Sequence, residues 1–156
     1  MSLFQSHTGR AFAHAGAGRG PDLIVNTDGA ARNNPGPAGF GYVILDRSGR
    51  DIEARGEFIG QATSNVADYR GMIAAARRAL ELGGRAVEFR VDSQLLERQV
   101  LGRYKVKAPH LKPLLAELMG VLDRLPEWSI RYTPRELNSA ADRLANRAID
   151  ARGVVA

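Results

Sequence analysis

The sequence predicts an α/β fold in which helices flank a mixed five-stranded sheet, with the elements in the order βββαβααβα. Two observations lead to this prediction. Three strand-like segments follow one another with only short connections, which favours an antiparallel meander. From about residue 65 onward the apolar residues recur at spacings of three and four, and helix-like segments then alternate with strand-like ones.

The strands are predicted from runs rich in β-branched and aromatic residues that are bounded by turn signals. The five predicted strands are DLIVNTD (22–28), GFGYVILDR (39–47), DIEARGEFIG (51–60), AVEFRVD (86–92) and EWSIRYT (127–133). The tight turn at Ser48-Gly49 joins the second strand to the third. The fourth strand follows a helix, so it is expected to run parallel to the first.

The first predicted helix covers about residues 65–82 and ends at Gly83-Gly84. Its apolar residues at helical spacing are Val66, Tyr69, Met72, Ile73, Ala76, Ala79 and Leu80. Further helices are predicted over 93–102, 111–125 and 138–152, and a basic loop over 103–113. Helices at these places would cover the faces of the sheet.

Composition narrows the class of protein. The chain has 156 residues, which suits one domain, and its 22 Lys and Arg against 17 Asp and Glu give a net charge of +5. This balance fits either an ordinary cationic surface or an anionic polymer as partner. No run reaches the ~20 apolar residues that cross a membrane, so no membrane partner is expected. The absence of cysteine excludes disulfides and thiolate zinc sites, and favours a cytoplasmic location.

Three segments are expected along the chain. Residues 1–21 lack acidic residues and show no useful periodicity, so they are expected to be a disordered leader, with a transit peptide as the alternative. Residues 22–152 are expected to form the folded domain, and residues 153–156 a tail.

Two predicted strands end on an acidic residue, Asp28 and Asp92. If the strands are parallel neighbours, both carboxylates reach the edge of the sheet where open α/β sheets bind ligands. Carboxylates that lie close together repel, and a divalent cation such as Mg²⁺ or Mn²⁺ removes that cost. The alternative is that these residues cap the following turn or helix, as Asp92 could do before Ser93-Gln94.

Two predicted helices also carry an acidic residue near their start, Asp68 and Asp142. The alternative explanation is local, because an early acidic residue complements the helix dipole and Asn65-x-x-Asp68 resembles a capping box. The four acidic residues together are more informative than any one of them.

Five segments then occur in a recognisable order from about residue 22 to 150: TDGAARNNPGPAGFGYV, TSNVADYRGMIAAARRALELG, VDSQLL, YKVKAPHLKPLL and ELNSAADRLAN. In this set and order the chain resembles type 1 ribonuclease H, in the short form without the extra basic helix. The resemblance implies endonucleolytic cleavage of the RNA strand of RNA/DNA hybrids with two Mg²⁺ ions, for which Mn²⁺ could substitute. The products would carry 5′-phosphate and 3′-hydroxyl ends.

The resemblance also implies which residues act. The catalytic and metal-binding residues would be Asp28, Asp68, Asp92 and Asp142. The residues expected to contact the hybrid are Gly29, Asn34, Ser64, Asn65, Gln94, Lys105, Lys107 and Arg135. Each of the polar residues in this set could instead belong to a turn, cap a helix or simply be exposed to solvent. A monomer is expected.

The chain departs from the family pattern at two positions. The usual helix residue is Glu, whereas Asp68 is one methylene shorter, which moves its carboxylate by about 1.5 Å. A backbone shift could compensate, a water could bridge the gap, or activity could be weak or favour Mn²⁺. The loop before the last helix lacks the usual His and carries Arg135 and Glu136.

Two other functions remain open at this stage. One is a hybrid-binding protein with weakened or lost catalysis, which only Asp68 favours. The other is a different nuclease of the wider fold, such as a DNA exonuclease or a transposase-like enzyme, and the ordered segments argue against it.

Overall fold

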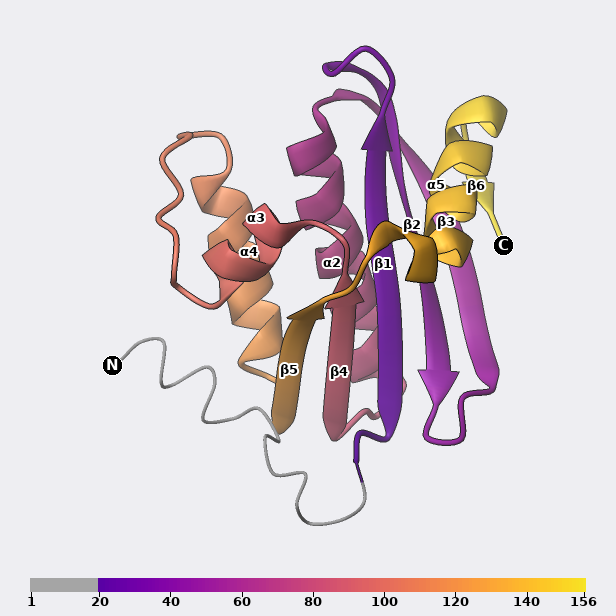
Figure 1. The fold of residues 1–156 in the computed structure, drawn as a ribbon, viewed down its shortest axis with the longest axis vertical. Coiled ribbons are helices and arrows are strands. Elements are labelled where there is room, and N and C mark those ends of the chain that lie inside the picture. Colours follow the sequence, from indigo (N-terminus) through magenta and orange to yellow (C-terminus); the bar gives the residue numbers. More distant parts are fainter. Residues whose placement is uncertain (1–19) are drawn as a thin grey trace.

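The computed structural model describes residues 20–156 as a six-stranded sheet with helices on both faces (Figure 1). The strands are β1 (Leu23–Ala31), β2 (Gly36–Asp46), β3 (Asp51–Ala62), β4 (Ala86–Val91), β5 (Glu127–Tyr132) and β6 (Val154–Val155). The helices are α2 (Ser64–Glu81), α3 (Gln94–Val100), α4 (Lys112–Leu122) and α5 (Ser139–Ala151), and a 3₁₀ turn, η2 (Arg135–Leu137), precedes α5. Residues 1–19 of the predicted leader lie outside the described residues.

The sheet has the order β5-β4-β1-β2-β3-β6, which confirms the predicted mixed topology. The strands β1, β2 and β3 form the antiparallel meander, and β4 and β5 run parallel to β1. In the segment between α3 and α4, residues 101–111, the structure contains no further helix.

The prediction of five strands is wrong by one. Residues 154 and 155 were expected in a tail, but they form β6, which pairs antiparallel with Gly56 and Glu57 of β3. A two-residue strand carries no periodicity, so only the exposed edge of β3 decides that it pairs. None of the helices within residues 20–156 is long and apolar enough to span a membrane.

The main core lies between the sheet and the helices α2, α3 and α4. Alternate β2 residues Phe40, Tyr42 and Ile44 are buried on this side, together with Met72 of α2 and Trp128 of β5. Alternation in a strand sends the intervening residues to the opposite face, where α5 lies.

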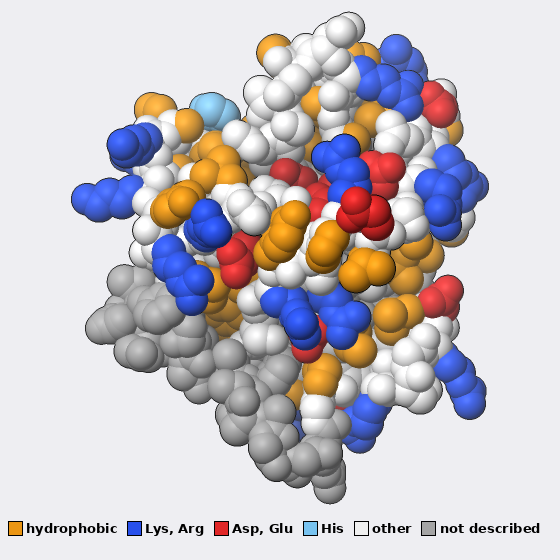
Figure 2. Space-filling view, in the orientation of Figure 1, with side chains coloured by type: hydrophobic (Ala, Val, Ile, Leu, Met, Phe, Trp, Pro, Cys, Tyr) orange, Lys and Arg blue, Asp and Glu red, His pale blue; other side chains and the backbone are white. Residues whose placement is uncertain are grey.

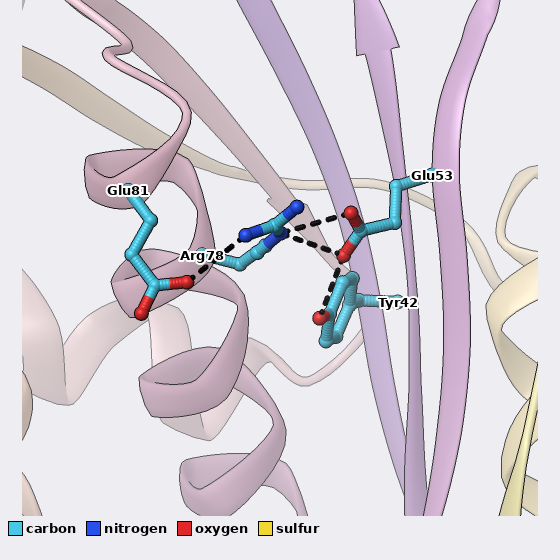
Figure 3. A network of polar contacts seen from close by, with 4 residues as sticks. All are labelled: Tyr42, Glu53, Arg78 and Glu81. Carbon is cyan, nitrogen blue, oxygen red and sulfur yellow. Dashed lines mark hydrogen bonds and ion pairs between the residues drawn. The ribbon is translucent and has the colours of Figure 1, made fainter.

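A polar network fastens the C-terminal half of α2 to the meander (Figure 3). The Nε of Arg78 donates to both carboxylate oxygens of Glu53, at 2.8 and 3.0 Å, and its NH1 donates to Glu81 at 3.1 Å. Tyr42 donates its hydroxyl to Glu53 at 3.3 Å. Burial, followed by the charge of Glu53, raises the pKa of Tyr42 to about 12, so Tyr42 stays a donor at neutral pH.

Helix α5 lies directly on glycines of the sheet. A Cβ atom on Gly41 would lie 2.3 Å from the carbonyl oxygen of Ala141, and one on Gly56 would lie 2.4 Å from that of Leu144. Both contacts are with helix backbone, which cannot turn aside as a side chain can. Glycine at these positions therefore lets α5 approach the sheet closely enough to place its acidic residue.

We expect Gly41→Ala to lower the free energy of unfolding by about 1–3 kcal/mol, because the added methyl group pushes α5 off the sheet. Gly120→Ala is the matched control, since a Cβ at Gly120 meets nothing within 4 Å. Gly120 lies inside α4, so alanine there should stabilise by up to about 1 kcal/mol. Urea unfolding measures the free energy of unfolding of both variants. Equal stability of Gly41→Ala and the parent would contradict the close packing of α5 against Gly41.

Candidate active site

The parallel pairing of β1 and β4 brings two carboxylates to one edge of the sheet. Thr27 pairs with Val91, so the residues that follow them, Asp28 and Asp92, lie side by side. The prediction that the first strand ends on Asp28 is wrong, because β1 continues to Ala31 by pairing with β2, whereas Asp92 directly follows the end of β4. Asp28 is only 8% exposed. On the face drawn in Figure 2, acidic side chains gather near the end of β4 and the start of α5, with Lys and Arg side chains around them.

Helix α2 brings the third carboxylate, Asp68, against the end of β1. The backbone N–H of Gly29 donates to Oδ1 of Asp68 at 2.9 Å. A Cβ at Gly29 would lie 2.4 Å from the backbone of Ala67 and Asp68, so only glycine allows the helix to lie this close. Gly29 thus positions an acidic residue, a role that the expectation of substrate contact did not include.

Helix α5 brings the fourth carboxylate, Asp142, close enough to the Asp28 carboxyl group to contribute to its raised pKa. Asn138, at the start of this helix, is 2% exposed and does not cap it through its side chain. Its Nδ2 donates instead to the carbonyl oxygen of Thr27 at 2.9 Å and to Oδ2 of Asp92 at 3.3 Å. Asn138 does not stand out in the sequence as a site residue, because an Asn before a helix has the pattern of an ordinary cap.

The alternative explanation that the acidic residues are helix caps is wrong for Asp68 and Asp92. Thr63 caps α2 by accepting from the N–H of Val66 at 3.2 Å. Ser93 caps α3 by accepting from the N–H of Leu96 at 3.1 Å. The local need for a cap is therefore met by neighbouring hydroxyl groups, and both carboxylates are left for the site.

Burial and the nearness of other carboxylates raise the pKa values of two aspartates in the site. Burial, then the charges of Asp92 and Asp68, raise the pKa of Asp28 to about 9, and hydrogen bonds with Asp92 and Asp142 add to the shift. Burial also raises the pKa of Asp68 to about 7. The Gly29 N–H and the positive charge of Arg135 partly oppose that shift, and the charge of Asp92 adds to it.

Comparisons with known proteins identify the family. A family model described as reverse transcriptase-like matches residues 26–148. A ribonuclease HI of Halobacterium salinarum is 39% identical over 132 residues, and the crystal structure of RNase H1 from this archaeon aligns with a TM-score of 0.81 over 83% of this chain and 98% of that one. The chain belongs to the type 1 ribonuclease H family of enzymes.

Another similar structure is that of LC11-RNase H1, which was isolated from compost and solved in complex with an RNA/DNA hybrid. It is 42% identical, with a TM-score of 0.79 over 83% of this chain and 98% of that one. A bifunctional protein of Mycobacterium tuberculosis is 39% identical over 130 residues, or 83% of this chain. The chain spans 66% of the Halobacterium ribonuclease HI and 36% of the mycobacterial protein.

The donor chemistry of this ribonuclease H site fits a divalent cation. Carboxylate oxygens are the ligands that Mg²⁺ and Mn²⁺ prefer, and burial together with neighbouring carboxylates raises the pKa values of Asp28 and Asp68. Within residues 20–156, however, no three acidic or histidine side chains are already spaced to hold one ion. The carboxylates of Asp68, Asp92 and Asp142 each accept a hydrogen bond on one oxygen, from Gly29, Asn138 and Asn146 respectively.

The residues predicted to contact the hybrid occupy several places around this ribonuclease H site. Oδ1 of Asn34 accepts from the N–H of Ser64 at 2.8 Å, so this pair links the β1–β2 turn to the start of α2. Asn65 and Gln94 are exposed at the starts of α2 and α3. Arg135 lies in η2, close enough for its charge to act on Asp68.

Two of the predicted contacts lie on a separate segment. Lys105 and Lys107 are exposed in the connection between α3 and α4. Their contact with a hybrid stays a prediction.

Without a divalent metal, the raised pKa of Asp28 should make the free energy of unfolding depend on pH. An unfolded aspartate loses its proton near pH 4, whereas folded Asp28 keeps it up to about pH 9. Between these values the folded state binds more protons than the unfolded state, so stability falls as the pH rises. We expect Asp28→Asn to raise the free energy of unfolding at pH 8 by at least about 1 kcal/mol, or roughly 2–4 °C in Tm.

The gain should shrink toward zero near pH 4, where Asp28 is neutral in both states. Thermal melts in a metal-chelating buffer at the two pH values measure it. Asp51→Asn removes an exposed carboxylate at the opposite end of the sheet and should not reproduce the pH-dependent gain. An equal gain at both pH values would show that charge is not the cause.

Proposed function

We propose that this domain cuts the RNA strand of RNA/DNA hybrids endonucleolytically, using two Mg²⁺ ions and leaving 5′-phosphate and 3′-hydroxyl ends. The observation that carries the proposal is the group formed by Asp28 with Asp68, Asp92 and Asp142, in which burial and then the charges of Asp92 and Asp68 raise the pKa of Asp28 to about 9. The relative solved with a bound hybrid has the same fold at 42% identity, which supports the substrate. A monomeric state and a cytoplasmic location remain predictions.

The four aspartates would hold the cations, which supply an activated water and a stabilised leaving oxygen. The protein groups around them hold the carboxylates in place. Asn138 keeps the Asp92 carboxylate and the end of β1 together, and the Gly29 N–H holds the Asp68 carboxylate. Because Asp28 is buried, its charge acts in a medium of low dielectric constant, where attraction to a cation is strong.

Recognition of the hybrid would rest on polar groups at the starts of the helices. Asn34, Asn65 and Gln94 can donate to or accept from the 2′-hydroxyl groups that distinguish RNA from DNA. Nδ2 of Asn34 remains available for this, because its hydrogen bond to Ser64 uses only Oδ1. Arg135 would face the phosphate backbone next to the acidic site.

A second candidate function is hybrid binding with weakened catalysis, and the hydrogen bond between Asp68 and Gly29 favours it. A side chain one methylene shorter than Glu and already engaged with the backbone is poorly placed to reach an ion. A displacement of about 1 Å in a catalytic group can cost ~10²-fold in rate.

We expect Asp28→Asn to abolish hybrid cleavage and Asp68→Glu to raise kcat by about 10-fold or more, since the longer side chain reaches past the Gly29 amide. The assay uses an end-labelled RNA/DNA hybrid with Mg²⁺ or Mn²⁺, and single-stranded RNA and duplex DNA serve as controls. Cleavage of the hybrid alone supports the proposed function. Binding without cleavage by either the parent or Asp68→Glu would refute it and leave the binding function.

Replacing Lys105 and Lys107 by alanine should weaken hybrid binding in low salt and flatten its salt dependence. Each lost phosphate contact should reduce the slope of log affinity against log salt concentration by roughly 0.7–0.9. Fluorescence anisotropy in Ca²⁺ or chelating buffer measures binding without turnover. An unchanged slope would show that this segment does not touch the hybrid.

A further inference from the structure

The turn between β1 and β2 is held rigidly by its own backbone. The N–H of Arg32 donates to the carbonyl oxygen of Pro37 at 2.9 Å. A Cβ at Gly36 would fall 1.6 Å from the carbonyl oxygen of Arg32, so no other residue closes the turn in this way. The backbone of Arg32 is therefore fixed relative to the end of β1, the strand that carries Asp28.

The side chain of Arg32 crosses from this turn to α5. Its NH1 donates to Oδ1 of Asp150 at 2.7 Å. Its NH2 donates to the backbone oxygen of Asn146 at 3.3 Å and to the Oδ1 of the same residue at 3.2 Å. The planar guanidinium thus contacts two residues of α5 at once, which a lysine ammonium on a flexible stem reproduces poorly.

Asn146 continues the chain of contacts to the acidic site. Its Nδ2 donates to the backbone oxygen of Asp142 at 3.0 Å and lies 3.4 Å from Oδ1 of Asp142. Residues 142, 146 and 150 are four apart, so they share one face of the helix. The Asp142 carboxyl group also lies close enough to Asp28 to contribute to the raised pKa of Asp28. Asp142 is thus connected, through Asn146, to a network of hydrogen bonds that begins at Arg32.

We propose that Arg32 and Asn146 are positioning residues for Asp142, with Arg32 acting through the amide of Asn146. The inference rests on the proposed function, because it assigns the Asp142 carboxylate to a divalent cation. Outer hydrogen bonds of this kind orient a carboxylate ligand before the ion arrives, and their loss costs ~10–100-fold in metal affinity. An amide that donates to one oxygen leaves the other free to bind the ion.

The same turn also contacts the other helix that brings an acidic residue. Asn34 accepts a hydrogen bond from the N–H of Ser64 at the start of α2, and Arg32 donates one to Asp150 of α5. One short turn therefore links the helices of Asp68 and Asp142 to the strand of Asp28. We therefore expect that a substitution of Arg32, although it lies on the surface, alters the position of the Asp142 carboxylate.

The test is calorimetric titration of the full chain with Mn²⁺ in the absence of nucleic acid. We expect Asn146→Ala to raise the Kd for Mn²⁺ by about 10-fold, and Arg32→Ala to raise it by a smaller factor. The double variant should bind no more weakly than Asn146→Ala, because residues that act through one another are not additive. Arg55→Ala is the matched control: its side chain is 44% exposed, as is that of Arg32, and its partner Glu57 lies on β3 away from the site.

Thermal melts accompany each titration, and Asn146→Ser replaces Asn146→Ala if the latter unfolds below the assay temperature. Equal Kd values for Arg32→Ala and Arg55→Ala, or additive losses in the double variant, would overturn the inference. So would an unchanged Kd for Mn²⁺ with a raised KM for the hybrid, which would make Arg32 a phosphate contact. A parent that binds Mn²⁺ but does not cut the hybrid refutes only the proposed function, and the titrations still decide the inference.

Discussion

The close packing of two helices against glycines of the central strands is the constraint on which the site depends. Helix α2 lies on Gly29 and helix α5 on Gly41, each at a distance where a single methyl group would strike helix backbone. Without these approaches, Asp68 and Asp142 would stand further from Asp28 than a shared site permits. Glycine supplies no chemistry here, yet its missing side chain sets the spacing of the carboxylates.

The same packing creates a cost in the folded protein. Burying Asp28 and bringing three other carboxylates close to it opposes folding, and the raised pKa of Asp28 expresses that opposition. The rest of the core has to offset it, through the apolar residues between the sheet and α2 and through polar fastenings such as Arg78 with Glu53. An active site that attracts cations is therefore a weak point in their absence.

The polar residues around the acidic group suggest how its geometry is kept. Asn138 bridges β1 and the Asp92 carboxylate, the Gly29 N–H holds Asp68, and Asn146 contacts Asp142. Each carboxylate other than Asp28 thus has a donor from the protein. The bond from Gly29 also has a second consequence, because Asp68 is short and this contact holds it back. The departure from the family's glutamate is therefore a question of reach, since Asp and Glu carry the same carboxylate group.

Much of this arrangement follows from the sequence alone. The kinds of element, their order and the places of the four aspartates are local properties, since hydrophobic periodicity and turn residues act within a few positions of each other. What only the tertiary structure decided are contacts between residues far apart along the chain: the pairing of β6 with β3, the reach of Asn138 to Thr27, and the crossing of Arg32 to Asn146. No local pattern marks them, because an Asn before a helix or an Arg in a turn has an ordinary local use. Their roles arise only when packing brings distant segments within hydrogen-bonding distance.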